Sequence, residues 1–369
     1  MRIGVNGTSL NTRIFETFIQ LAKLHPEHTF LFFYDTETNT SDLPQNIIPF
    51  VITPQATIPL KWRIWYNLKL PSALKKNKAD IFISEKFISF KTKIPQILLS
   101  PDFTYIFQPS VIDKKHFLFY KKNTPKFLNK AERIVVNSHF FRNEIVDRLK
   151  IEEEKVKVIY PEIERIPDPM SQEEKEAIKE KYAEGNEYFI YNGIISTERN
   201  LVNLLKAFSF FKKRQRSKMQ LLIAGKRGAK YDEFVRSLQS YRFKNEVRLL
   251  EEVTPNQTEK IVATAYSMLY VPFYESEGDD VIEAVKLEVP LIVSNTRFLK
   301  EYCGDAALYV DPNNFNDIAE KMMLLFKDEQ KRKELIQKGK LQIEKFLNEK
   351  RSEILFELIE HEAKKNPLN

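Results

Sequence analysis

Short apolar runs alternate along the chain with longer segments that carry apolar residues at helical spacing. Runs of strand length occupy residues 1–5, 30–34, 50–53, 81–84, 96–100, 133–137 and 156–160, and again residues 188–192, 220–225, 247–250, 268–272 and 291–293. Helical spacing is found in segments such as residues 15–24, 64–75, 117–130 and 257–265. Apolar strands that alternate with helices indicate parallel sheets covered by helices on both faces. The pattern therefore predicts an α/β protein with doubly wound sheets.

A charged segment interrupts this alternation near the middle of the chain. Residues 161–186 hold three prolines and many charged residues, which predicts an interdomain linker with one solvated helix. At 369 residues the chain is long enough for two domains, each with its own core. We therefore expect a first domain over residues 1–165, a linker over 166–186, a second domain over 187–345 and a helical tail over 346–369.

The segment MLYVPFYESEGDDVIEAVKLEVPLIVSN, residues 268–295, reads as strand, acidic loop, helix and strand. Glu275 follows the first strand, and Glu283 lies one turn into the helix. Backbone N–H groups at a helix N-terminus, here residues 278–281, favour an anion such as a diphosphate. A solvated helix start, whose acidic residues only complement the helix dipole, would give the same local pattern.

This segment resembles the E-x7-E signature of retaining glycosyltransferases of family 4, in the order strand, Pro, Tyr, Glu, Gly, Val-Ile-Glu-Ala and Val-Pro. The stretch GIISTERNLVNLLKAFSFF resembles the same family's strand, G-R loop and Lys-Asn helix, with Arg199 and Asn200 at the Lys-Asn positions and Ile194 in place of the arginine. The resemblance implies the GT-B fold, in which two Rossmann-like domains face each other across a cleft. It also implies that the C-terminal helix crosses back to the first domain.

The resemblance implies an acceptor-binding first domain, a nucleotide-sugar-binding second domain and a set of site residues. Because Ile194 removes a cation, Lys226 at the end of a neighbouring strand is the candidate to replace it on the diphosphate. The catalytic candidates are Glu275 and Arg199, the donor-binding candidates are Glu283, Lys226, Gly278, Asp279, Asp280, Val281 and Gly193, and the acceptor-side candidates are Asp102, Gly7 and Thr8.

The implied activity is that of a hexosyltransferase that retains anomeric configuration and needs neither a metal nor another cofactor. Its donor would be a UDP- or GDP-linked sugar, and its acceptor a glycan, a lipid-linked glycan or another envelope component. No cluster of His and carboxylate residues at metal-ligand spacing is present in the sequence, which agrees with a metal-independent reaction.

Charge is distributed unevenly along the chain. Residues 61–130 carry 15 basic and four acidic residues, and the basic ones are interleaved with aromatics, as in KWRIWYNLK and KKHFLFYKKNTPKF. This pattern suits an anionic membrane surface or an anionic acceptor, but lysines on ordinary solvated faces would also produce it. The sequence contains no recognisable nucleic-acid-binding module, so nucleic acid is not an expected partner.

Cysteine content and hydropathy bear on the cellular location. The single cysteine, Cys303, cannot form an internal disulfide, which favours a reducing compartment. The N-terminal segment lacks the apolar core of a signal peptide, and no apolar run reaches 18 residues. We expect a cytoplasmic protein whose membrane contact, if any, is peripheral.

Two hypotheses on function remain open from the sequence. The first is an active glycosyltransferase of the kind described above. The second is a catalytically silent protein of the same fold that binds a membrane surface or a partner, because residues 275–280 carry four acidic side chains where a diphosphate would bind.

Overall fold

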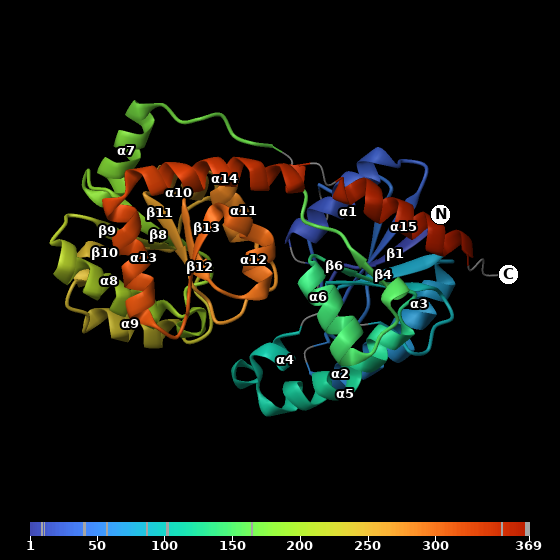
Figure 1. Ribbon diagram of the computed structural model, residues 1–369. Coiled ribbons are helices and arrows are strands. Elements are labelled where there is room, and N and C mark those ends of the chain that lie inside the picture. Colours follow the sequence, from blue (N-terminus) through green and yellow to red (C-terminus); the bar gives the residue numbers. More distant parts are fainter. Residues whose placement is uncertain are drawn as a thin grey trace. The chain divides into compact units, whose positions relative to one another are not determined.

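The computed structural model describes residues 1–8, 10, 12–39, 42–56, 58–85, 88–100, 103–163, 165–347 and 350–365. The chain divides into two compact units. Unit 1 contains Met1–Glu162 and the C-terminal helix α15 (Arg351–Lys365), and unit 2 extends from Ile163 through α14 (Glu329–Leu347). Both units are α/β structures with a central parallel sheet (Figure 1).

The described part of unit 1 contains a seven-stranded sheet in the order β3-β2-β1-β4-β5-β6-β7. All of its paired strands are parallel. The order reverses between β1 and β4, so the sheet is doubly wound, as the alternating pattern predicts. Its strands are β1 (Arg2–Asn6), β2 (Thr29–Tyr34), β3 (Ile47–Val51), β4 (Ile81–Ser84), β5 (Gln96–Leu99), β6 (Arg133–Val136) and β7 (Val156–Val158).

Helices connect these strands and cover the sheet (Figure 1). The α-helices before the C-terminal one are α1 (Thr12–Leu24), α2 (Pro59–Ile64), α3 (Leu70–Lys76), α4 (Thr104–Phe107), α5 (Lys114–Lys130) and α6 (His139–Asn143). The π- and 3-10 segments are η1 (Trp65–Lys69), η2 (Pro109–Val111), η3 (Glu144–Arg148) and η4 (Glu153–Lys155). Helix α15 packs against α1 and completes the core of unit 1, where the ring of Phe356 stacks on His25 at 3.5 Å.

Unit 2 repeats this arrangement. In its described residues a six-stranded sheet has the order β10-β9-β8-β11-β12-β13, again with parallel pairs only. The strands are β8 (Tyr188–Asn192), β9 (Gln220–Ala224), β10 (Val247–Leu250), β11 (Ser267–Tyr270), β12 (Leu291–Ser294) and β13 (Ala307–Val310). The order reverses between β8 and β11, and such a switch point is where doubly wound sheets bind ligands.

The helices of unit 2 lie on both faces of its sheet (Figure 1). The α-helices that precede α14 are α7 (Gln172–Ala183), α8 (Leu201–Gln215), α9 (Tyr231–Gln239), α10 (Pro255–Thr264), α11 (Asp279–Lys286), α12 (Arg297–Cys303) and α13 (Phe315–Lys327). Three short 3-10 segments are η5 (Thr197–Arg199), η6 (Lys244–Glu246) and η7 (Gly304–Ala306).

Local sequence sets several helix starts. Ser138 caps α6, since its side chain accepts a hydrogen bond from the Phe141 N–H at 3.2 Å. The helix expected from residue 117 begins earlier, at Lys114, because Asp113 caps it. The strand expected at residues 50–53 lies instead at Ile47–Val51. Pro49 is tolerated there because β3 is an edge strand.

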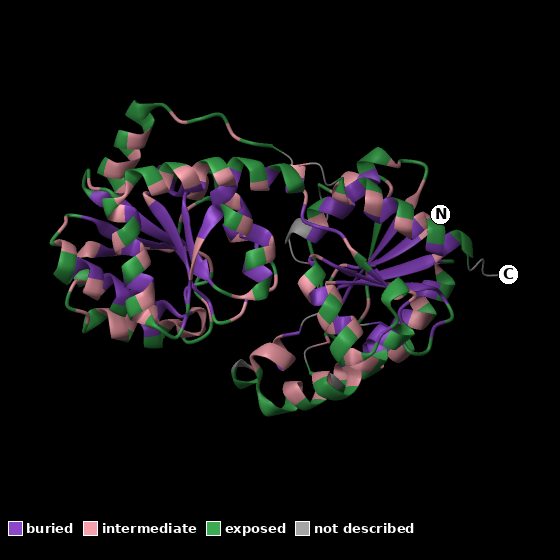
Figure 2. Ribbon diagram, viewed as in Figure 1, coloured by how far each residue is buried: buried purple, intermediate pink, exposed green. Residues whose placement is uncertain are grey.

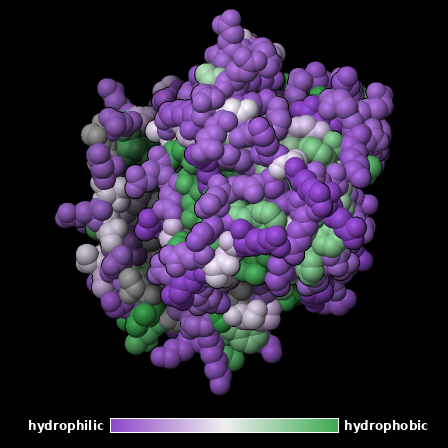
Figure 3. Space-filling model, turned by 90° about the vertical axis from the view of Figure 1, so that its left-hand side faces the viewer, coloured by the Kyte–Doolittle hydropathy of each residue, from purple (hydrophilic) through white to green (hydrophobic). Residues whose placement is uncertain are grey.

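The core of each unit is its sheet, as Figure 2 shows by the buried strands. Every residue of β4, β5, β9, β11 and β12 is buried, as expected for parallel strands covered on both faces. On the face drawn in Figure 3, hydrophobic side chains appear only in small separate groups.

Candidate functional site

A cavity of about 250 Å³ lies at the carboxyl ends of β8, β9 and β11, at the switch point of the unit 2 sheet. Its position is the one that a doubly wound sheet offers to a ligand. Most of its lining comes from three loops and the start of α11. The lining residues are Asn192, Gly193, Ile194, Arg199, Gly225, Lys226, Tyr270, Glu275, Glu277, Gly278, Asp279 and Asp280.

Two glycines bring the loops after β8 and β9 into direct contact. Gly193 and Gly225 have φ values of 142° and 141°, which side chains disfavour. A Cβ atom on Gly225 would lie 1.8 Å from the carbonyl oxygen of Gly193. The Ile195 N–H donates to the Lys226 carbonyl at 2.8 Å, so the loops continue side by side beyond the strands. This close approach leaves backbone, rather than bulky side chains, along one wall of the cavity.

An ion pair between Arg199 and Glu275 lies in the cavity. Arg199 Nη1 donates to Glu275 Oε2 at 2.9 Å, although 76 positions separate the two residues in the sequence. The other carboxylate oxygen accepts the N–H groups of Ser276 at 2.7 Å and Glu277 at 2.9 Å, and the Tyr270 hydroxyl also donates to Glu275. Glu275 is only 5% exposed. These contacts fix its carboxylate in one orientation.

The backbone next to Arg199 is held equally firmly. Ser196 caps the short η5 segment through the N–H of Glu198, and Asn200 adopts a left-handed conformation with φ 64°. The Asn200 side chain donates to the Val271 carbonyl at 2.7 Å and to the Pro312 carbonyl at 2.8 Å. Asn200 therefore ties the arginine loop to the loop that carries Glu275.

The start of α11 supplies a backbone wall. Gly278 is its N-cap, with φ 74° and no side chain to occupy the helix end. A Cβ atom at this position would collide with the ring of Tyr302 at 2.5 Å. The first backbone hydrogen bond of the helix runs from the Ile282 N–H to the Gly278 carbonyl at 3.1 Å. The N–H groups of residues 279–281 precede that bond and have no partner further back in the helix.

Asp280 is a carboxyl of this cavity whose pKa is raised. Its Oδ1 accepts a hydrogen bond from the Asn192 amide at 3.0 Å, and its Oδ2 lies near Gly193. Burial raises the pKa of Asp280 to about 7, and the negative charges of Glu275 and Asp279 add to the shift. Part of the population is therefore uncharged at neutral pH.

This raised pKa leads to a testable prediction. The folded state binds the Asp280 proton more tightly than the unfolded chain, so the group reduces stability as the pH rises from about 4 through 7. Asp280→Asn keeps an acceptor for Asn192 and removes the charge. We expect the variant to gain roughly 2 kcal/mol more stability at pH 8 than at pH 5, measured by denaturant unfolding. Equal gains at both pH values would contradict the assignment.

The cations of the cavity are fewer than its carboxylates. Glu275, Glu277, Asp279 and Asp280 face two cations, Arg199 and Lys226. Lys226 is exposed, and no ion pair engages it within the described ranges of the chain.

The neighbouring cation, Arg227, is already engaged outside the cavity. Its Nε donates to Glu251 at 2.8 Å, and its guanidinium lies over the Tyr231 ring. Ile194 stands where the sequence resemblance expects an arginine. Lys226 is therefore the cation that is left to take the place of that arginine.

Some of the predicted site residues lie elsewhere. Glu283 does not line the cavity; it pairs with Lys286 at 2.6 Å on the same helix, and the Val281 side chain is buried. On unit 1, the Gly7 N–H donates to the Phe33 carbonyl at 2.9 Å, and Thr8 Oγ1 accepts the Asp35 N–H at 2.9 Å. Asp102 lies outside the described residues. The acceptor-side assignments stay predictions.

Five lining residues were not candidates from the sequence, and one of them, Ile194, was noted only as the residue in place of the arginine. Asn192 and Gly225 stand at strand ends, where a ligand crevice is expected, so their positions held a signal that was available. Tyr270 and Glu277 belong to the predicted strand and acidic loop. Their side chains carried no pattern that distinguished them from core and solvent-facing residues.

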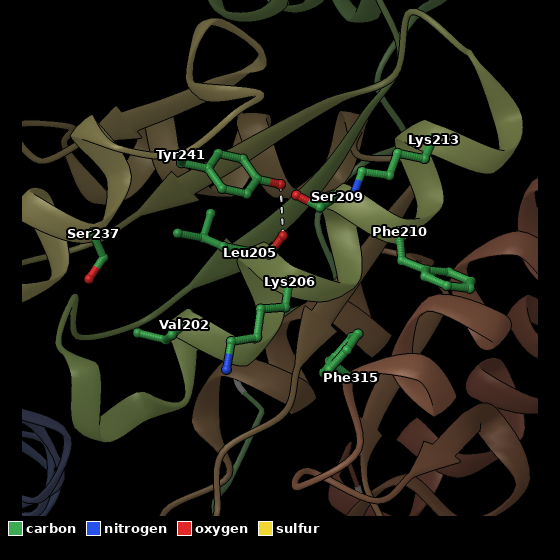
Figure 4. Close-up of a pocket in the computed structure, with 9 residues that line it drawn as sticks. All are labelled: Val202, Leu205, Lys206, Ser209, Phe210, Lys213, Ser237, Tyr241 and Phe315. Carbon is green, nitrogen blue, oxygen red and sulfur yellow. Dashed lines mark hydrogen bonds between the residues drawn. The ribbon is translucent and has the colours of Figure 1, made fainter.

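A second cavity on unit 2, of about 310 Å³, lies among α8, α9 and the start of α13 (Figure 4). Its hydroxyl-bearing Tyr241 is engaged, because it donates to the Leu205 carbonyl at 2.7 Å. Two exposed lysines, Lys206 and Lys213, line it. It contains no carboxylate and none of the predicted site residues. The cavity at the switch point is therefore the better candidate site.

Within the described ranges, no group of three or more His, Cys, Asp or Glu side chains is arranged to hold a metal ion. Nor does any helix of the described residues combine the length and the apolar character needed to span a bilayer.

Comparison with solved structures defines the fold class. A glycosyltransferase from Rickettsia africae superposes with a TM-score of 0.74 at 15% identity, covering 98% of both chains. Anabaena HepE in complex with UDP and glucose gives 0.74 at 13% identity, covering 98% of this chain and all of that one. Sucrose-phosphate synthase from Thermosynechococcus elongatus gives 0.76 at 14% identity over 98% of both chains. The fold is GT-B, as the sequence resemblance implied.

Matches to two sequence families then show the family of the chain. The family Glycosyltransferase Family 4 matches residues 11–164, and the family Glycosyl transferases group 1 matches residues 172–342. The chain belongs to the group 1, family 4 glycosyltransferases.

Its curated relatives are distant. O-antigen chain mannosyltransferase B of Escherichia coli is 25% identical over 239 residues, which cover 64% of this chain and 63% of that protein. O-antigen chain mannosyltransferase RfbU of Salmonella typhimurium is 26% identical over 214 residues, 57% of this chain and 54% of that protein. The matches thus span less than two thirds of either relative's own length.

Proposed function

We propose that the chain is a retaining, metal-independent glycosyltransferase that moves a hexose from a nucleoside diphosphate to a glycan or lipid-linked envelope acceptor. The observation that carries the proposal is the pair between Arg199 and the buried carboxylate of Glu275 beside the start of α11, in the switch-point cavity. The names of the curated relatives, both O-antigen mannosyltransferases, favour mannose as the sugar and a growing polysaccharide as the acceptor.

In this proposal the residues around the cavity have separate roles. Arg199 and Lys226 neutralise the diphosphate, and the N–H groups at the start of α11 bind its oxygens. Glu275 lies on the other side, where its fixed carboxylate stabilises the positive charge that develops on the sugar ring. Glu283 binds the ribose hydroxyls once it exchanges its contact with Lys286 for them.

The reaction then balances without a further reactant. The bond between the anomeric carbon and the diphosphate oxygen breaks, and its electron pair leaves on the diphosphate. The acceptor hydroxyl oxygen forms the new bond to the anomeric carbon, and its proton passes to the departing diphosphate. Arg199 and Lys226 stabilise the charge that accumulates on this leaving group.

Titration calorimetry with UDP, GDP and their hexose conjugates tests the proposal. We expect one nucleotide to bind with micromolar affinity and the other at least tenfold more weakly, a difference of about 1.4 kcal/mol in binding free energy. Glu283→Ala should weaken that binding. Glu288→Ala, which removes an exposed carboxylate paired with Lys340 just after the same helix, should not.

The calorimetry also separates the two hypotheses on function. No binding of either nucleotide at millimolar concentration would show that the acidic loop prevents donor binding, and would favour a catalytically silent GT-B protein. If Glu283→Ala and Glu288→Ala bind the nucleotide equally well, only the assignment of Glu283 to the ribose hydroxyls is contradicted.

A further inference from the structure

The switch-point cavity holds more negative charge than its cations balance. Of the described residues that line it, four are carboxylates and two are cations. Arg199 is already paired with Glu275, so Lys226 is the lining cation that remains for the other three carboxylates. A nucleoside diphosphate sugar adds a further negative charge on each phosphate, and like charges repel strongly where little water separates them. Donor binding therefore calls for a compensating positive charge.

Asp280 is placed to accept that charge as a proton. Its Oδ1 accepts a hydrogen bond from the Asn192 side-chain amide at 3.0 Å. Its Oδ2 lies on the side of Gly193, where a Cβ atom would be 3.3 Å away, and both residues line the cavity. Across the described parts of the chain, no ion pair engages Asp280 and no donor reaches Oδ2. Because Oδ1 already accepts from Asn192, Oδ2 is the atom that can carry a proton.

Charged and titratable groups surround Asp280 from several segments. Burial raises the pKa of Asp280 to about 7, and the neighbouring carboxylates add to the increase while Arg199 opposes it. Burial also raises the pKa of the two nearby phenols, so they stay neutral. The groups concerned are Asp279 on α11, Glu275 and Glu277 in the preceding loop, Arg199 after β8, and the phenols Tyr191 of β8 and Tyr270 of β11.

From this arrangement we propose that the donor binds together with one proton, which Asp280 takes up on Oδ2 and donates to a diphosphate oxygen. Protonation removes a negative charge from the cavity and turns an acceptor into a donor, so one event relieves repulsion and adds a strong hydrogen bond. The proton comes from solvent and returns to it after the nucleoside diphosphate dissociates. The inference rests on the proposed function and deepens it, because it makes donor binding at that site dependent on pH.

The expected direction of the pH dependence follows from the two states of Asp280. Negative phosphates beside the carboxyl raise its pKa further in the complex than in the free protein. At pH 6 the group is mostly protonated in both states, so binding takes up little proton. Above pH 7 the free protein has lost the proton and binding must restore it. Affinity should therefore be about tenfold higher at pH 6 than at pH 8.

Titration calorimetry on the full chain measures the proton directly. UDP-glucose and GDP-mannose are the probes, because both of their phosphates are esterified and neither releases a proton near neutral pH. Each is titrated at pH 6 and at pH 8 in pairs of buffers that differ in ionisation enthalpy, such as HEPES and Tris at pH 8. The dependence of the binding enthalpy on the buffer gives the proton uptake. We expect about one proton at pH 8 and close to none at pH 6 for the sugar nucleotide that binds.

Two variants locate the proton. Asp280→Asn keeps an acceptor for the Asn192 amide but cannot titrate, so its binding should take up no proton and should be equal at the two pH values. At pH 8 it should bind the sugar nucleotide several-fold more tightly than the unaltered chain does. Glu277→Gln is the matched control, because it removes an exposed carboxylate from the same cavity and should keep the proton uptake.

The other outcomes are distinguishable. Binding without proton uptake at pH 8 would overturn the inference and leave the donor site standing, and the unaltered chain alone gives this result. Uptake that persists in Asp280→Asn would assign the proton to another group. Binding that requires added Mg²⁺ and takes up no proton would show that a divalent cation neutralises the loop. Absence of binding at pH 6, where the cavity is least charged, would contradict the proposed function and this inference with it.

Discussion

Arg199→Ala is expected to weaken binding of the donor nucleotide by about a hundredfold and to lower the stability of unit 2. The guanidinium is the less exposed of the two cations in the cavity, and its loss removes a charge-assisted contact to the diphosphate. It also leaves the carboxylate of Glu275, which is 5% exposed, without its partner. Leaving a buried carboxylate without its cation in this way costs roughly 3 kcal/mol.

Two measurements separate these effects. Calorimetry gives the nucleotide affinity, and thermal unfolding gives a midpoint that we expect to fall by about 5–10 °C. Arg199→Lys keeps the charge and should recover most of the stability but only part of the affinity, since lysine lacks the planar fork. Arg227→Ala is the matched control, because that arginine lies in the adjacent loop but pairs with Glu251 outside the cavity. Unchanged nucleotide affinity in a folded Arg199→Ala variant would remove the diphosphate assignment.

Glu275→Gln is expected to reduce sugar transfer by about a thousandfold while nucleotide binding is kept. The glutamine oxygen can still accept the N–H groups of Ser276 and Glu277, so the loop keeps its shape. The negative charge that would stabilise the cationic sugar is lost, at a cost of roughly 4 kcal/mol in the transition state. The free nucleoside diphosphate should bind equally or a few-fold more tightly, because one repulsive carboxylate is gone and Arg199 is released.

Turnover of the sugar nucleotide and calorimetry with the free nucleotide measure this split. Glu277→Gln serves as the control: it removes the same charge from the same cavity at an exposed position and should leave turnover within about threefold. A similar small loss in both variants would mean that Glu275 only maintains the loop. The mechanism would then need another carboxylate beside the sugar.

Periodicity in the sequence was sufficient for the α/β class and its parallel sheets. Apolar runs such as residues 188–192 and 268–272 became β8 and β11 because strands buried on both faces admit few polar residues. The sequence families and the solved structures confirm the family resemblance that residues 193–200 and 275–284 carried. Errors arose at element ends, where a cap or an edge position decided the boundary, as at Asp113 and Pro49.

The site was less accessible to sequence reasoning. Glu275 and Arg199 were candidates from their motif positions and Lys226 from its place at a strand end, and the structure brings all three to one cavity. Glu283 was a candidate on the same grounds, yet in this structure its carboxylate pairs with Lys286 and lies outside the cavity lining. A motif fixes the order of residues along the chain, but not which of them a local i,i+3 partner engages.

The sequence by itself determined that this is an α/β protein with an acidic loop at a helix start and a strongly basic segment at residues 61–130. Only the tertiary structure decided which charges act together. Arg199 meets Glu275 because the sheet order places β8 beside β11. Glu251 engages Arg227, whereas no ion pair of the described residues engages Lys226. The physical reason is that secondary structure follows from short-range spacing, whereas electrostatic partners are set by contacts between segments far apart in the sequence.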